Sequence, residues 1–334
     1  MADQRVDTTR LQRFARAYCE TAVFYAALDL ELFTHIANGA NTEEKLVVTL
    51  DLSPLNVERL VTATLAMKLI EWDGANLRNA PDAARFLVKD QPGYAKDWMT
   101  FTRHEVGDWI HLTERLQSKE PPSTLGMYDD LTVEQARKYH AATYSIGMGA
   151  GKRFCRHVDL SKRTKLLDIG GGSGAYCINA VKTYPNLQAV VLDLPPVTEV
   201  AKEYLALAGV EDRVATLPGA FTKTPFPTDV DAAVMASNLP IYNEEMIQLV
   251  VQKVHDALLP GGEFHLVGEM VDNDRCAPLD AALWGLAEVI NGSAGKAHTI
   301  VKCIVYFNNA GFDHVSDEVF VTGTLHRITG IKAG

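Results

Sequence analysis

Residues 166–174 read Leu-Leu-Asp-Ile-Gly-Gly-Gly-Ser-Gly, and this stretch decides the fold. Its apolar half predicts a short buried strand, and its glycine half predicts a tight turn that opens a helix. The first turn of such a helix leaves backbone N–H groups free, and the glycines let a ligand approach them closely. The ligand stays open at this point, because Gly170, Gly172 and Ala175 also satisfy the permissive Gly-x-Gly-x-x-Ala pattern of dinucleotide-binding proteins.

Two acidic residues narrow the choice of ligand. Asp168 ends the predicted strand two residues before the first glycine, where it would repel a pyrophosphate but would suit an ammonium group. Asp193 ends the next predicted strand and can accept hydrogen bonds from both hydroxyls of a ribose. A nucleoside with an amino-acid tail satisfies both carboxylates.

Strands and helices alternate from residue 164 onward. Short, apolar, β-branched segments are separated by helix-length stretches, which is typical of an α/β fold with a doubly wound parallel sheet. Two later segments, 315–321 and 324–328, can form an antiparallel pair that closes one edge. The predicted strands are 165–169, 189–192, 213–217, 230–236 and 263–267, and the predicted helices are 175–184, 196–208 and 243–259.

The first half of the chain is predicted to be mainly helical. A second helix should begin at Ser53-Pro54, and Asp73-Gly74 between two short apolar segments predicts a hairpin, so the order of elements is that of a winged helix. The first helix carries an apolar face that needs a partner, either its own domain or a second copy of the chain. This face consists of Leu11, Phe14, Tyr18, Tyr25, Leu28 and Leu32.

Composition argues against several kinds of partner. The 334 residues are enough for two domains, and 32 Lys+Arg against 42 Asp+Glu give a formal net charge of −10. An acidic surface disfavours nucleic acid and anionic membranes. The first residues lack the apolar core of a signal peptide, no apolar run suits a membrane span, and the five scattered cysteines are typical of reduced thiols. We therefore expect a cytoplasmic protein with no nucleic-acid, membrane or metal partner.

Residues 10–330 resemble the plant and bacterial O-methyltransferase family typified by caffeic acid O-methyltransferases. This resemblance implies a class I methyltransferase Rossmann-like fold, the cofactor S-adenosylmethionine, a small-molecule substrate and a homodimer. It also implies a helical winged-helix dimerisation domain at 1–110, a helical linker that contributes to the substrate pocket at 111–160, and a catalytic domain at 161–334. The landmarks are the winged-helix region, 168–174, Leu192-Asp193-Leu194-Pro195, Gly219-Ala220-Phe221 and Leu259-Pro260-Gly261-Gly262.

The resemblance also implies which residues hold the cofactor. Asp193 and Leu194 would hold the ribose, and Phe221 the adenine, with Gly219 and Ser237 nearby. Where the family usually has an acid for the adenine amino group, this chain has Ala220, so one adenine contact must come from elsewhere. The methionine part would be surrounded by Asp168, Gly170, Gly172 and Gly174.

One expected residue is missing. The family's O-methyltransferases place a catalytic His in a stretch resembling Leu-His-Asp-Trp-x-x-Glu, but residues 239–245 read Leu-Pro-Ile-Tyr-Asn-Glu-Glu, with Pro240 at the His position. Three explanations compete. In the first, the base is relocated to His104, His140 or His298; in the second, the cofactor serves only as a charge, without methyl transfer; in the third, the nucleophile needs no base.

The third explanation is the most economical, because a thioether has a lone pair and no proton to lose. The chain accordingly resembles the bacterial methylthiohydroxybutyrate S-methyltransferases of dimethylsulfoniopropionate synthesis, which belong to the same family. The implied reaction methylates the sulfur of 4-methylthio-2-hydroxybutyrate. A winged-helix regulator that senses S-adenosylmethionine is an alternative from another class, which the acidic charge disfavours.

Such a substrate carries a carboxylate, which calls for an Arg or a charged His. Arg103 and His104 lie in the segment that roofs the pocket in the family, and Arg137 and Arg153 are weaker alternatives. Glu269 matches a family acid that orients the missing His, so its role is open. The expected pocket walls are Tyr144, Met148, Tyr242 and Trp284, and the expected polar contacts are Asn238 and Glu288.

Overall fold

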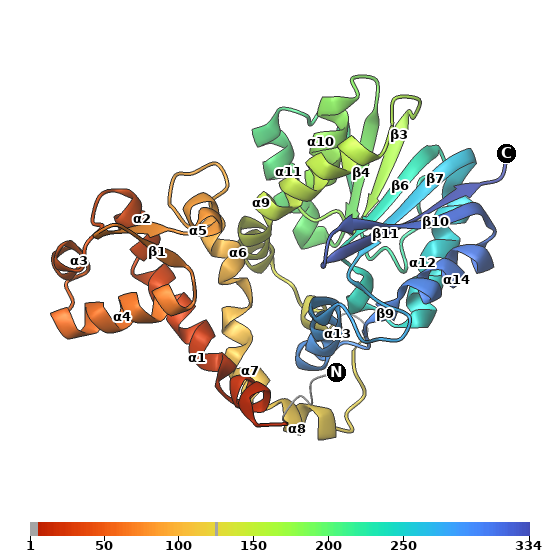
Figure 1. The fold of residues 1–334 in the computed structure, drawn as a ribbon. Helices are drawn as coiled ribbons and strands as arrows, with labels where there is room; N and C mark the ends of the chain where they lie inside the picture. Colours follow the sequence, from red (N-terminus) through yellow and green to blue (C-terminus); the bar gives the residue numbers. More distant parts are fainter. Residues whose placement is uncertain (1–5, 124–125) are drawn as a thin grey trace, which may run out of the picture. The chain divides into compact units, whose positions relative to one another are not determined.

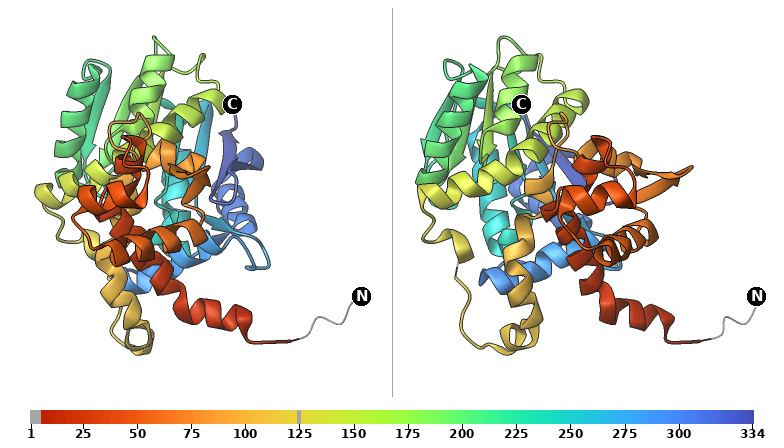
Figure 2. Two further views of the ribbon diagram at one scale, coloured as in Figure 1. Left: turned by 60° about the vertical axis from the view of Figure 1, so that its left-hand side comes forward. Right: turned by 90° about the vertical axis from the view of Figure 1, so that its left-hand side faces the viewer.

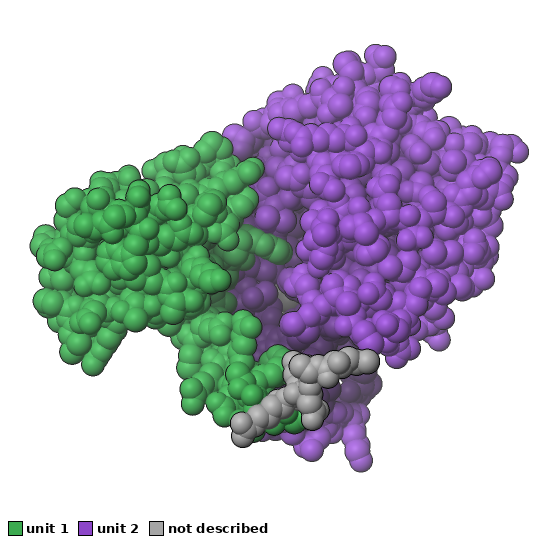
Figure 3. Space-filling model, in the orientation of Figure 1, with its two compact units in different colours: residues 1–100 green, residues 101–334 purple. Residues whose placement is uncertain are grey.

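The computed structural model describes residues 6–123 and 126–334, which form two compact units, one ending at Thr100 and one beginning at Phe101 (Figure 3). The expected boundaries at residues 110 and 160 both fall inside the second unit, and the finer division stays a prediction. In the described part of the chain, no helix is long and apolar enough to cross a membrane.

The first unit is built from helices and one hairpin, as predicted. Ser53 caps its fourth helix by accepting a hydrogen bond from the Asn56 N–H at 3.3 Å, and the hairpin turns at Gly74, whose φ is +64°. Leu28 is buried in the core of this unit. Its elements are α1 (Thr9–Asp29), α2 (Leu32–Ala37), α3 (Glu43–Leu50), α4 (Pro54–Ala66), β1 (Ile70–Asp73), β2 (Asn76–Asn79), α5 (Pro81–Phe86) and α6 (Lys96–Met99).

A seven-stranded sheet forms the centre of the described part of the second unit. Five strands are parallel, in the order β7-β6-β3-β4-β5, and the antiparallel pair β11 and β10 closes the β7 edge. The doubly wound fold is thus confirmed. The strands are β3 (Lys165–Ile169), β4 (Gln188–Asp193), β5 (Val214–Pro218), β6 (Val230–Ala236), β7 (Leu258–Gly268), β10 (Phe312–Val321) and β11 (Leu325–Lys332).

Helices cover both faces of this sheet (Figures 1 and 2). Side chains of β3 alternate between two cores: Leu166 packs under α9–α11, whereas Leu167 and Ile169 pack under α12 and α14. Burial on both faces explains why the strands are almost continuously apolar. The helices on one face are α9 (Val133–His157), α10 (Ala175–Thr183) and α11 (Pro195–Ala208), and on the other α12 (Glu244–Ala257) and α14 (Ile300–Ala310).

Three features differ from the sequence prediction. β7 begins at Leu258 rather than at residue 263, because Leu258 pairs with Val230 before the register shifts. Two helices, α13 (Leu279–Asn291) and α14, were not predicted, although each ends at a glycine with positive φ. The predicted helical segment before α9 consists of short pieces: η1 (Phe101–Glu105), α7 (Val106–Ile110), α8 (Leu112–Gln117) and η2 (Gly126–Tyr128).

A single carboxylate fastens the start of β3 to β6. Asp231 accepts hydrogen bonds from the backbone N–H groups of Thr164 and Lys165, at 2.8 and 2.9 Å, and from the Thr164 hydroxyl at 2.9 Å. We expect Asp231→Ala to lower the free energy of unfolding by about 2–3 kcal/mol, because it leaves two backbone donors unpaired. Urea denaturation followed by circular dichroism measures this change.

Asp229 provides the matched control, since it lies two residues away and pairs with the Lys165 ammonium at 2.7 Å while remaining 68% exposed. Asp229→Ala should cost no more than about 1 kcal/mol, the range of exposed ion pairs. Equal losses for the two variants would contradict the assigned role of Asp231.

Candidate functional site

The predicted glycine turn lies at the carboxyl end of β3. Gly170, Gly172 and Gly174 have φ of +65°, +56° and +76°, a region that side-chain-bearing residues rarely adopt. A Cβ atom on Gly172 would also lie 2.8 Å from Cε1 of His140. Backbone conformation and close approach therefore both require glycine here.

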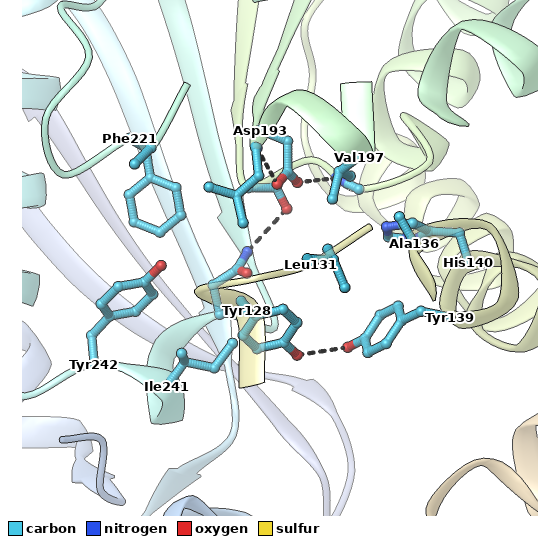
Figure 4. Close-up of a pocket in the computed structure, with 15 residues that line it drawn as sticks. Tyr128, Leu131, Ala136, Tyr139, His140, Asp193, Val197, Phe221, Ile241 and Tyr242 are labelled. Atoms are coloured by element: carbon cyan, nitrogen blue, oxygen red, sulfur yellow. Dashed lines mark hydrogen bonds between the residues drawn. The ribbon is translucent and has the colours of Figure 1, made fainter. Parts of the chain in front are cut away.

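A cavity opens beside this turn, with an empty volume of about 700 Å³ (Figure 4). Its walls come from the ends of β3, β4 and β6 and from η2, η3 (Leu239–Ile241) and α9. The lining residues are Tyr128, Leu131, Ala136, Tyr139, His140, Gly170, Gly172, Asp193, Leu194, Val197, Ala220, Phe221, Asn238, Ile241 and Tyr242.

Asp193 connects the loops around the cavity. Its carboxylate accepts hydrogen bonds from the N–H of Gly172 at 2.8 Å and from the N–H of Leu194 at 2.7 Å, and its carbonyl accepts from Gly219 N–H at 2.8 Å. Burial raises the pKa of this carboxyl to about 6. The side chain is thus fixed, with lone pairs left for a ligand.

Asp168 is a second buried carboxyl at the end of β3, 1% exposed. The thiol of Cys177 donates to its Oδ2 at 3.5 Å, and burial raises its pKa to about 7. Among the residues that shift the pKa of Asp168 or Asp193, none is Lys, Arg or His. A cationic group would therefore be well accommodated here.

Asn238 and Tyr242 line the cavity, where the sequence predicted them. The Asn238 amide donates to the carbonyls of Gly170 at 3.1 Å and Ala236 at 2.8 Å, so it holds the glycine turn against β6. Ser237 is exposed, with a φ of +55°, and does not line the cavity.

Other expected substrate contacts lie outside the described lining of this cavity. Tyr144 stacks on Tyr204, with ring centroids 4.2 Å apart, and the sulfur of Met148 accepts from the Asn179 amide at 3.4 Å. Trp284 is half-buried on α13. Tyr144 and Met148 thus pack against the core under α9–α11.

The acidic and basic candidates are also engaged elsewhere. Glu288 accepts hydrogen bonds from Ser293 and Asn291 at the end of its own helix, α13. Arg103 is exposed on η1, whose Phe101 ring packs edge-on against Tyr139 at 4.9 Å. The weaker alternatives are bonded to the protein: Arg137 pairs with Glu203 at 2.6 Å, and Arg153 donates to the Phe320 carbonyl.

Pro240 is buried in η3, at the position of the family's His. Of the three candidate histidines, His298 uses both ring nitrogens: Nε2 donates to the Tyr242 carbonyl at 2.9 Å, and Nδ1 accepts from the Tyr306 hydroxyl at 3.0 Å. His104 is exposed and donates from Nδ1 to the Phe101 carbonyl at 3.0 Å. His140 lines the cavity, but burial lowers its pKa to about 4.

Glu269 follows β7 with one carboxyl oxygen, Oε2, buried and without a hydrogen-bond partner. Burial raises its pKa to about 7, and the Ser237 hydroxyl opposes that shift through a hydrogen bond. With Pro240 in place of a His, the acid has no imidazole to orient.

Tyr128 and Tyr139 were missed by the sequence analysis. Their hydroxyl groups lie 3.3 Å apart across the cavity (Figure 4). A signal was present, because Thr132 and Gln135 form a capping box that fixes the start of α9. Helical spacing from that start places Ala136, Tyr139 and His140 on one face.

Residues 121–313 match the family model described as O-methyltransferase domain. Among curated proteins, the 3-hydroxy-5-methyl-1-naphthoate 3-O-methyltransferase of Streptomyces sahachiroi is 27% identical, over 97% of this chain and 95% of that protein. An N,N-dimethyltransferase of Streptomyces rimosus is 28% identical, over 78% of each chain.

Solved structures share the fold over the whole chain. A Nostoc punctiforme protein superposes with a TM-score of 0.88 at 22% identity, covering 98% of this chain and 100% of its own. Human N-acetylserotonin methyltransferase, solved in complex with S-adenosylmethionine, gives a TM-score of 0.81 at 20% identity and covers 100% of both chains.

The buried carboxyl of Asp168 has a pKa of about 7, so we expect cofactor binding to be linked to proton release. S-adenosylmethionine carries a sulfonium and an ammonium, and a cation that binds beside Asp168 lowers the pKa of that carboxyl. Below the ligand-free pKa of about 7, binding must then expel a proton. Affinity should rise from pH 6 to pH 7, by at most about tenfold per group.

Calorimetry at pH 6.5 in two buffers of different ionisation enthalpy measures this release. The ligand's own ammonium stays protonated at that pH, so the protons must come from the protein. Asp168→Asn should reduce their number. Binding without net proton release would contradict the assignment of a cationic group to Asp168.

Proposed function

The chain belongs to the O-methyltransferase domain family and is a methyltransferase that uses S-adenosylmethionine, and we propose that its acceptor atom is a thioether sulfur. The observation that carries this proposal is Pro240, a buried residue without a proton-accepting group where the family's base is expected. A thioether is an acceptor that needs no base, because it has a lone pair and no proton to lose.

The residues of the site fit this cofactor. The buried carboxyl of Asp168 has no cationic partner among the groups that shift its pKa, so it suits a ligand that brings its own positive charge, and Gly170 and Gly172 of the turn line the cavity. In our proposal, Asp168 and the three turn glycines surround the methionine part, while Asp193 and Leu194 hold the ribose. Phe221 covers the adenine, beside Gly219 and Ala220, and Ser237 lies at the edge.

Bound S-adenosylmethionine supplies an electrophilic methyl group on a positively charged sulfur. The acceptor sulfur forms its new C–S bond with a lone pair while the donor C–S bond breaks, so charge passes from one sulfur to the other and no proton moves. The protein's contribution is to align the two sulfurs and exclude water.

The lining of the cavity suits a cation that forms on the acceptor. The rings of Tyr128, Tyr139, Phe221 and Tyr242 contribute to its walls, and among the described lining residues there is no Lys or Arg. Aromatic faces stabilise a cationic centre, most strongly where water is excluded.

We propose 4-methylthio-2-hydroxybutyrate as the acceptor, with 4-dimethylsulfonio-2-hydroxybutyrate as product. Its carboxylate would point toward η1, where Phe101 and Tyr139 connect the cavity to Arg103 and His104. The hydroxyl of Tyr139, which accepts from the Tyr128 hydroxyl, can donate to the same group, because burial raises its pKa and keeps it protonated.

A panel of acceptors tests the proposal. Purified protein and S-adenosylmethionine are combined with 4-methylthio-2-hydroxybutyrate, methionine, 3-methylthiopropionate and several phenols, and products are identified by mass spectrometry. We expect the hydroxy acid to be methylated in a 1:1 ratio with S-adenosylhomocysteine formed, and methionine at least about tenfold less efficiently, since its ammonium differs from a hydroxyl by one charge. S-adenosylhomocysteine without a methylated product would contradict methyl transfer.

An O-methyltransferase with a relocated base is the second candidate, favoured by the presence of His140 in the cavity. Methylation of phenols alone would refute the sulfur proposal. His140→Gln should then cost 10²- to 10⁴-fold in kcat, the usual contribution of a general base.

We further infer a homodimer that joins through a winged-helix first unit, in a reducing cytoplasm that suits its five free cysteines. The start of α1 is exposed, with Leu11, Phe14 and Tyr18 at 57%, 63% and 72%. The exposed first half of α1 would be only marginally stable as a helix in water by itself. A second copy of the same stripe would cover it.

Light scattering after size exclusion should therefore give twice the mass of one chain. Leu11→Glu combined with Phe14→Glu should shift it to a monomer, because charges would be buried in the contact. Val48→Glu is the control, since Val48 is 81% exposed on α3. A monomeric unmodified protein at micromolar concentration would refute this interface.

A further inference from the structure

Lys253 on α12 reaches across to the loop that follows β5. Its Nζ donates to the carbonyls of Phe221 at 2.5 Å and Thr224 at 2.8 Å. The same ammonium lies 4.3 Å from the centroid of the Phe226 ring. One side chain thus makes three contacts with a single loop, 219–226.

That loop forms one wall of the cavity through Ala220 and Phe221. Its first end is fixed by the hydrogen bond from Gly219 N–H to the Asp193 carbonyl, and its middle by Thr224 N–H, which donates to the Ala220 carbonyl at 2.8 Å. The carbonyls of Phe221 and Thr224 in turn accept hydrogen bonds from Lys253. The lysine therefore completes the set of contacts that hold the Phe221 backbone.

The contact also has an electrostatic reason. Carbonyl oxygens in a partly buried loop cost free energy when they are unpaired, and a charged donor satisfies them better than a neutral one. Burial lowers the pKa of Lys253, because removing its ammonium from water disfavours the charged form. An apolar residue of equal length would leave both carbonyls unsatisfied.

We propose that Lys253 is a positioning residue for the adenine end of the cofactor, acting through the Phe221 loop without touching the ligand. The proposal rests on the placement of adenine on Phe221 proposed above. At Ala220 the chain offers no carboxylate to the adenine amino group, so adenine binding depends on the shape and order of the loop. Lys253 supplies that order.

Three variants test this role. Lys253→Met keeps the length and removes the donors, Lys253→Arg keeps a charged donor, and Gln252→Met changes the adjacent residue, whose amide bonds to exposed Asp256 at 2.9 Å. Dissociation constants are measured by calorimetry for S-adenosylhomocysteine and for 5′-methylthioadenosine, which has the adenine but no amino-acid tail. Thermal unfolding without ligand reports the fold, and Lys253→Gln replaces the Met variant if that variant unfolds.

We expect Lys253→Met to weaken both ligands about tenfold, as the loss of a charged hydrogen bond implies, and Lys253→Arg to recover most of the affinity. KM for S-adenosylmethionine should rise, whereas kcat at saturating cofactor should stay within about twofold. Gln252→Met should match the unmodified protein. Unchanged affinity for 5′-methylthioadenosine in the folded Lys253→Met variant would overturn the proposal.

Phe221→Ala separates this failure from a failure of the proposed site. If Phe221→Ala weakens 5′-methylthioadenosine and Lys253→Met does not, the role of Lys253 is wrong and the adenine placement stands. If Phe221→Ala binds both ligands like the unmodified protein, adenine does not lie on Phe221, and the inference falls with it.

Discussion

The site depends on Asp193, whose backbone and carboxylate together bind three loops. One carboxylate oxygen holds the glycine turn, the other holds the start of α11, and the backbone carbonyl holds the loop after β5. The carboxyl ends of parallel strands always bring such loops to one edge of a sheet, but they do not fix the loops in place. Here a single buried acid does so, and its cost of burial is offset by backbone donors rather than by a cation.

The half of the cavity proposed for the acceptor differs in its chemistry from the half proposed for the cofactor. Asn238 holds the turn to β6 with hydrogen bonds, whereas Pro240, two residues later, adds only shape. Glu269 has one buried carboxyl oxygen without a hydrogen-bond partner. Aromatic rings make up much of the remaining wall. Such a wall selects by shape and by affinity for positive charge, not by proton transfer.

The strands of the central sheet could be predicted closely, because the apolar runs in the sequence coincide with the segments that are buried in the structure. β3 and β6 have the predicted bounds, since each is a short apolar run between turn residues and is buried on both faces. The residues proposed for the cofactor lie at strand ends, where sequence motifs can indicate them. Tyr128 and Tyr139 were not indicated in this way, because they meet through the path of the chain between η2 and α9, which no short motif encodes. Lys253 is likewise an ordinary helix residue until α12 packs beside the β5 loop.

The placement of Pro240 has a consequence for how such enzymes diverge. The donor side is built from strand ends and the turns that follow them, and the acceptor side largely from η2, η3 and α9, which come from other parts of the chain. A replacement in η3 can therefore alter the chemistry demanded of the acceptor while the strand-end carboxyls keep their surroundings. In this architecture a new reaction can arise when a basic side chain is lost, without the gain of another catalytic group. The methyl donor can stay the same throughout.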